Sequence, residues 1–109
     1  MTPEEHAQAI RELAPTYGEA KAQRVFLDEF KKSKKAMLMR DALLNGIEAA
    51  NHQEREAYSN PEYLQLIKGL AAAIETEETL RWQLESHRLD IEIFRSREAT
   101  ARLQDKAHQ

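Results

Sequence analysis

Four lysines stand close together in one segment of this chain, Lys31-Lys32-Ser33-Lys34-Lys35. Clustered lysines can bind the phosphate groups of a nucleic acid, and such binding weakens as salt is added. On a helix these lysines spread over about 400°, so they surround the helix instead of forming one face. Two arginines of a distant segment are expected beside them in an antiparallel pair of helices. The sequence therefore predicts a nucleic-acid-binding set made of Lys31, Lys32, Lys34, Lys35, Arg88 and Arg95.

Acidic residues near these cations support a second interpretation. They would neutralise the cations as ordinary surface ion pairs, through Asp28, Glu29, Glu85, Asp90 and Glu92. The net charge of −3 does not favour nucleic-acid binding driven by bulk charge. The net charge is +3 over residues 19–44, −5 over residues 45–79 and +1 over residues 80–109. A third interpretation is therefore self-assembly, in which segments of opposite charge set the register between copies of the chain. These alternatives stay open.

The remaining polar residues do not form a recognisable catalytic motif. His52 has Glu48 and Glu56 four residues away on either side, but the Glu-x-x-His pattern of metal-binding bundles does not occur. We interpret His52 as a surface residue and His87 as a polar spacer on an apolar helix face. No nucleophile–base arrangement, glycine-rich phosphate loop or cysteine pair is present in the sequence. We therefore expect no catalytic residue, metal, cofactor or small-molecule substrate, and no enzyme.

Three helices should position these residues, over 3–14, 19–58 and 61–102, with a turn at 59–60. Thr2, Pro3 and Glu5 have the types and order of a capping box, and Pro15 should end the first helix. Asn60 followed by Pro61 is a strong start for the last helix. Gly46 is the single glycine of the middle helix, which should tolerate it. The prediction is one all-α domain over 1–109, a short helix followed by a long antiparallel hairpin of coiled-coil type.

Two bands of apolar residues run along the middle helix. We expect the stronger stripe to face the last helix. It contains Phe26, Phe30, Met37, Leu44, Ile47 and Tyr58. The weaker band contains the smaller residues of the helix together with two leucines, namely Leu27, Leu38, Ala42, Ala49 and Ala57. A turn at 59–61 would place residue i of one helix opposite residue 120 − i of the next.

A second apolar face on the last helix indicates self-association. Trp82, Leu89 and Ile93 share a face that is turned away from the predicted hairpin contact. Large apolar groups on an outer face usually mark an interface, so these three residues are the predicted oligomer interface. A two-fold dimer is the simplest form of such a homo-oligomer. The alternative is a three-helix monomer in which the N-terminal helix covers Trp82.

The chain has no cysteine, no apolar stretch at its N-terminus and no apolar run of the roughly 20 residues that cross a bilayer. We therefore expect a soluble, cytoplasmic protein that has no contact with membranes.

The sequence resembles small helical proteins encoded by tailed phages and prophages, often near recombination and replication genes. The resemblance covers roughly residues 20–100 and rests on Val25–Ala36, Glu54–Tyr58, Pro61–Tyr63, Leu80–Trp82, Ile91-Glu92 and Phe94–Ser96. It carries over no functional residue. It implies a non-enzymatic, oligomeric accessory protein of phage DNA recombination or replication, which contacts DNA or a DNA-processing protein. The alternative is an adaptor or inhibitor that binds a host protein and no nucleic acid.

Overall fold

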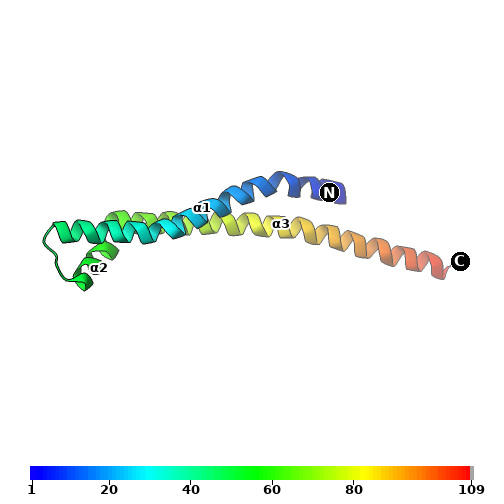
Figure 1. Cartoon of the computed structure of the whole chain (residues 1–109). Coiled ribbons are helices and arrows are strands. Elements are labelled where there is room, and N and C mark those ends of the chain that lie inside the picture. Colours follow the sequence, from blue (N-terminus) through cyan, green and yellow to red (C-terminus); the bar gives the residue numbers. More distant parts are fainter. Residues whose placement is uncertain (109) are drawn as a thin grey trace. The chain divides into compact units, whose positions relative to one another are not determined.

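The computed structural model describes residues 1–108, which form three α-helices and no strand (Figure 1). The helices are α1 (Pro3–Leu44), α2 (Ala50–Ser59) and α3 (Pro61–Ala107). The predicted all-α class is confirmed. Within the described part of the chain, no helix combines the length and apolar character needed to cross a membrane.

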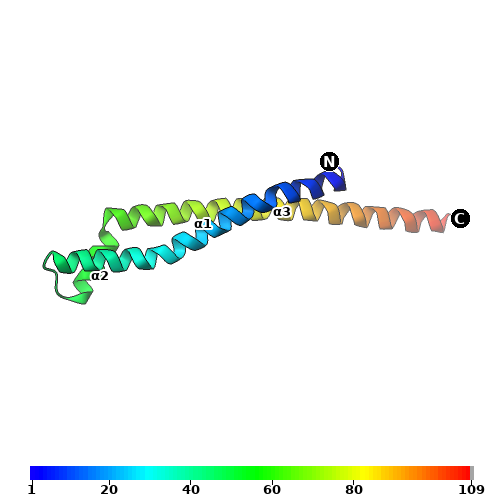
Figure 2. The same cartoon turned by 45° about the horizontal axis from the view of Figure 1, so that its top comes forward.

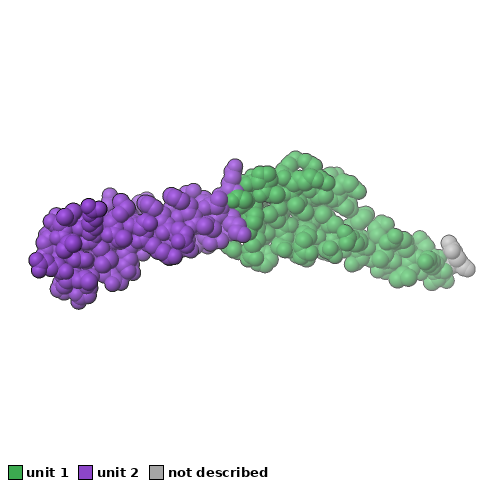
Figure 3. Space-filling model, viewed as in Figure 1, with its two compact units in different colours: residues 1–18, 78–109 green, residues 19–77 purple. Residues whose placement is uncertain are grey.

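Two compact units divide the chain, and α1 and α3 contribute to both (Figure 3). Unit 1 contains residues 1–18 together with the part of α3 that follows residue 77. Unit 2 contains residues 19–77, which include the rest of α1, all of α2 and the start of α3. The single long hairpin over the whole chain stays a prediction.

The start of α1 follows the predicted capping box. The Glu5 backbone N–H donates to Thr2 Oγ1 at 3.1 Å, and the Thr2 hydroxyl lies 3.3 Å from Glu5 Oε1. The predicted end of this helix at residue 14 is wrong, because α1 continues through Pro15. Proline has a φ near −65°, which is a helical value, so it costs one backbone hydrogen bond and local crowding, about 3 kcal/mol in all. Leu13 and Tyr17, on either side of it, are partly buried, and packing of this kind offsets that cost.

Helix α1 ends at Leu44, so the predicted continuous helix over 19–58 is also wrong. Gly46 has a φ of 95°, in the left-handed region that favours glycine. The Ile47 N–H donates to the Ala42 carbonyl and the Gly46 N–H to the Leu43 carbonyl, both at 3.0 Å. These two bonds are the Schellman motif, which satisfies the last carbonyls of a helix. The glycine that we expected inside a helix therefore ends it.

The short helix α2 lies between the end of α1 and the start of α3 in both views (Figure 1 and Figure 2). The Gln53 side-chain amide donates to the carbonyls of Ile47 at 2.8 Å and Glu48 at 3.2 Å, which fixes the connection from α1. Asn60 caps α3 as predicted, since its Oδ1 accepts the Glu62 N–H at 2.8 Å. At its other end α3 extends five residues beyond the predicted limit of 102.

The α1 and α3 segments of unit 2 run antiparallel. Lys34 pairs with Glu62, and Arg24 pairs with Glu77 further along both helices. The predicted pairing of residue i with 120 − i is therefore wrong in this unit. The helix break at Gly46 ends α1 earlier than predicted, and α2 follows it in the chain before α3 begins. Each residue of α1 therefore pairs with a residue about 20 positions earlier in α3 than predicted.

The core of unit 2 uses the weaker apolar band. Its buried apolar residues are Leu38, Ala42, Ala57 and Leu70. The stronger stripe does not face α3 as predicted, because Phe26, Met37 and Leu44 are 59%, 53% and 74% exposed. Small side chains allow helices to approach closely, and this explains why the band that contains alanines forms the contact. The larger side chains are left on the outside.

Candidate interaction surfaces

Lys31 and Lys32 form ion pairs within α1. Lys31 Nζ lies 3.2 Å from Asp28 Oδ1, and Lys32 Nζ lies 3.3 Å from Glu29 Oε2. Each partner stands three residues earlier on the same helix, and the Lys32 pair is largely exposed. Exposed pairs of this type contribute about 0–1 kcal/mol, so a phosphate group could displace their carboxylates at small cost.

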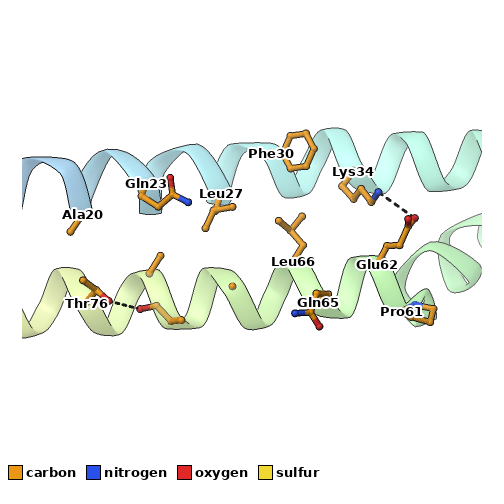
Figure 4. A pocket seen from close by; sticks show the side chains of 13 residues that line it. Ala20, Gln23, Leu27, Phe30, Lys34, Pro61, Glu62, Gln65, Leu66 and Thr76 are labelled. Carbon is orange, nitrogen blue, oxygen red and sulfur yellow. Dashed lines mark hydrogen bonds and ion pairs between the residues drawn. The ribbon is translucent and has the colours of Figure 1, made fainter.

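Lys34 and Lys35 connect α1 to other elements of unit 2. Lys34 Nζ lies 3.3 Å from Glu62 Oε2 at the start of α3 (Figure 4), and Lys35 Nζ lies 3.1 Å from Glu54 Oε1 on α2. Lys35 Nζ also lies 4.7 Å from the centre of the Tyr58 ring. The interaction with Tyr58, followed by that with Glu54, raises the pKa of Lys35 above its ordinary value of 10.5. Two of the predicted phosphate-binding lysines therefore make contacts that hold the unit together.

Arg88 and Arg95 belong to unit 1, so the structure divides the six predicted cations between the two units. Arg88 lies 2.9 Å from Glu85, whose hydrogen bond raises the pKa of the Arg88 guanidinium above its ordinary value. Arg95 lies 4.0 Å from Glu92. All six cations thus have a carboxylate partner. Four of these partners are ones that the ion-pair interpretation named, whereas Lys34 and Lys35 pair with Glu62 and Glu54 instead. Their binding to nucleic acid stays a prediction.

Trp82, Leu89 and Ile93 are exposed on α3 within unit 1, at 59%, 48% and 47%. The Arg81 guanidinium carbon lies 4.9 Å from the centre of the Trp82 ring. The exposure of Trp82 contradicts the alternative in which the N-terminal helix covers this residue. These three residues, called the Trp82 face below, are available for contact with another molecule, and their role in an oligomer stays a prediction.

A groove in unit 2, missed by the sequence analysis, runs between α1 and α3 (Figure 4). Its volume is about 900 Å³, and most of its lining is apolar. From α1 it is lined by Ala20, Gln23, Leu27, Phe30 and Lys34, and from α3 by Pro61, Glu62, Gln65, Leu66, Gly69, Ala72, Ala73 and Thr76. The small residues at 69, 72 and 73 are the sequence signal, because they leave space beside a helix.

An ion pair between the two helices of unit 2 also escaped the sequence analysis. Arg24 Nε and Nη2 donate to the two carboxylate oxygens of Glu77 at 2.7 and 3.1 Å. Glu77 is only 7% exposed, and a glutamate is rarely buried to this extent unless it is paired. A bidentate arginine–carboxylate pair fixes both separation and register. It sets the alignment of α1 and α3.

Two histidines of unit 1, His6 and His87, meet in a small polar cluster. The Nδ1 atoms of His6 and His87 lie 2.8 Å apart, and His6 Nε2 lies 3.6 Å from Asp90 Oδ2. Asp90 was expected to neutralise a cation of the basic segment, and here it contacts His6 instead. Among residues 1–108, no group of three or more histidine, aspartate or glutamate side chains could hold a metal ion. The cluster joins the N-terminal part of α1 to α3.

Comparison with known proteins adds no relative. No family model matches the sequence, and no curated protein or solved structure shows a significant match. The resemblance to phage-encoded proteins therefore stays a prediction.

Proposed function

We propose that this chain is a non-enzymatic helical adaptor that binds a partner protein on the Trp82 face. The observation that carries the proposal is the exposure of Trp82, Leu89 and Ile93 on one helix. Tryptophan is enriched among residues that dominate binding energy, and neighbouring aliphatic groups exclude water around it. Arg81 beside the ring can contribute a charged rim to the same contact.

The pattern of charges supports an adaptor over a nucleic-acid binder. All six predicted phosphate contacts have carboxylate partners, and Lys34 and Lys35 link α1 to α3 and α2. Engaging phosphate through Lys34 or Lys35 would break these links. The Trp82 face requires no such exchange, because its apolar groups already face solvent.

Affinity capture tests the adaptor. We expect the immobilised full chain to retain a specific protein from extracts of its own cells. The double variant Trp82→Ser/Ile93→Ser should weaken retention by about 30-fold or more, since loss of a central tryptophan typically costs at least 2 kcal/mol. Phe94→Ser is the matched control, because Phe94 is also exposed on α3 and lies about 100° or more around the helix from the three residues of this face. Equal retention by all three chains would contradict the proposal.

Contact with DNA is a second candidate function, as part of recombination or replication. It is favoured by the excess of basic over acidic residues, seven against four, within residues 19–44. The weak intrahelical pairs of Lys31 and Lys32 could exchange their carboxylates for phosphates.

Fluorescence anisotropy with a short DNA duplex tests this second function. Binding at low salt should fall steeply as salt is added, with a slope set by the number of phosphates contacted. Replacing Lys31, Lys32, Lys34 and Lys35 by glutamine should abolish it, whereas the same change at Lys21, Lys68 and Lys106 should reduce it less. If the protein does not bind at low salt, or if the first set has no effect, DNA contact through this segment is excluded.

A further inference from the structure

We propose that the groove of unit 2 is occupied by a second copy of this chain, related by a two-fold axis parallel to the helices. The result is a four-helix bundle in which α1 of one copy lies on α3 of the other. This inference does not rest on the proposed adaptor function, because the groove and the Trp82 face belong to different units.

The groove has an apolar surface that the chain itself leaves uncovered. Leu27 and Leu66 lie on opposite walls, and the glycine and alanines of α3 leave an open space between them (Figure 4). A Cβ atom added at Gly69 would meet no atom within 4 Å. The chain's own packing therefore does not require a glycine at this position. A side chain from another molecule can occupy the space beside it.

Side chains of the right size lie on the same surface. Phe30 lines the groove, and the ring of Phe26 stacks on the ring of Phe30 with the ring centres 5.7 Å apart. The Lys34–Glu62 and Arg24–Glu77 pairs place Phe30 approximately level with residue 68 of α3. A two-fold axis along the helices preserves this level, so Phe30 of one copy would lie over Gly69 of the other. The large side chains of α1 in each copy thus pack against the small residues of α3 in the other copy, and the two-fold axis repeats this contact.

Charge selects this orientation. Residues 19–44 of α1 carry seven basic and four acidic side chains, whereas residues 61–77 of α3 carry one basic and three acidic. The proposed axis brings α1 against α3, which places net positive charge beside net negative charge. An axis perpendicular to the helices would place α1 on α1, basic segment on basic segment. The proposed axis also makes all neighbouring helices antiparallel, as in other four-helix bundles.

The available area suits a dimer. Met37 and Leu44 extend the apolar surface beyond the groove along α1. Residues 20–34 of α1 cover about 21 Å beside α3, where two helices are about 20 Å wide, and residues 35–44 add about 15 Å of a single helix about 10 Å wide, which gives a flat footprint of about 570 Å². Stable interfaces bury about 800 Å² per partner, and a corrugated surface buries more than its flat footprint. The contact with α2 does not block this surface, because α2 meets α1 through Lys35 on another side.

Sedimentation equilibrium of the full chain tests the dimer. We expect twice the chain mass of 12.6 kDa for the unaltered protein. Gly69→Leu should give the mass of a single chain, because its Cβ meets no atom of the same copy within 4 Å and the rest of the new side chain extends into the groove. Gly18→Leu is the matched control and should stay dimeric, since Gly18 also lies in open space on a helix but outside the groove.

Disulfide trapping tests the orientation, because the natural chain has no cysteine. Chains with Phe30→Cys and chains with Gly69→Cys are mixed and oxidised. The proposed axis predicts several-fold more cross-linking in the mixture than in either variant alone. Cross-linking that is strongest for Phe30→Cys alone would place α1 on α1 and overturn this geometry.

The remaining outcomes also decide the question. A single-chain mass for the unaltered protein at all concentrations overturns the dimer and leaves the adaptor function standing. A dimer that survives Gly69→Leu but is lost in Trp82→Ser/Ile93→Ser assigns self-association to the other face and overturns the groove. If the unaltered protein is a dimer but captures no partner protein, the adaptor alone is contradicted.

Discussion

At the residue scale, the Arg24–Glu77 pair is the most specific interaction of unit 2. Two of the three guanidinium nitrogens, Nε and Nη2, donate to the carboxylate, and Glu77 is almost fully buried. Removing one partner from such a pair leaves the other charge without compensation, which costs more than the pair itself contributes. Replacement of both partners by apolar groups of similar volume is often neutral.

Arg24→Met should therefore lower the free energy of unfolding by about 2 kcal/mol, and the double variant Arg24→Met/Glu77→Leu should recover most of that loss. Urea unfolding followed by circular dichroism measures both. Lys32→Met, which breaks an exposed pair, should change the stability by less than about 0.5 kcal/mol. If the double variant is less stable than Arg24→Met, the pair is a net source of stability.

Lys35 gives a pH dependence whose sign follows from its contacts. Its pKa is raised in the folded protein by Tyr58 and Glu54, so the protonated form is favoured by folding. This contribution is complete below the ordinary pKa of 10.5 and is lost as the pH rises through the higher value of the folded state. Thermal unfolding from pH 9 to above the ordinary pKa should show a decrease in Tm that is smaller in Lys35→Met. An identical decrease in both proteins would show that other groups cause it.

At the element scale, the caps were predictable and the helix ends that lack a strong cap were not. Thr2 and Asn60 combine a preferred capping side chain with a following proline, and both start helices as expected. Gly46 was ambiguous, because a glycine inside a helix and one at its end differ only in context. The following Ile47 is the missed signal, since an apolar residue after the glycine is typical of the Schellman motif.

Substitution of Gly46 tests the importance of this helix end. Gly46→Ala should destabilise the protein by about 1–2 kcal/mol, because alanine is strained at a φ of 95°. Gly18→Ala is the control and should stabilise it by up to about 1 kcal/mol, since Gly18 lies inside α1 with open space around it. Denaturant unfolding measures both changes. A neutral Gly46→Ala would mean that α1 and α2 tolerate a different connection.

Apolar periodicity located the surfaces of the helices but assigned them to the wrong partners. The stripe with Phe26, Met37 and Leu44 has the stronger pattern, yet the alanine-containing band forms the core of unit 2. A periodic stripe shows that a face avoids water, and it does not say which helix covers that face. The groove escaped prediction for the same reason, since it depends on how α1 and α3 align. Residues such as Arg24 and Glu77, which fix that alignment, are far apart in sequence.

At the scale of the whole molecule, exposed apolar surface explains more than charge does. The predicted cations have carboxylate partners, whereas the Trp82 face and the groove of unit 2 present large apolar groups to solvent. Self-association through one surface would leave the other available for a partner protein. An apolar interface is little affected by salt, whereas assembly through opposite charges weakens as salt screens them.

The mass of the chain in solution, measured by light scattering at low and high salt, tests this view most directly. We predict twice 12.6 kDa at both salt concentrations, because burial of apolar groups supplies the energy of association and charge only selects the orientation. A dimer that dissociates at high salt would show that ion pairs hold it together. A single-chain mass under both conditions would contradict the central claim that the exposed apolar groove of unit 2 joins two copies.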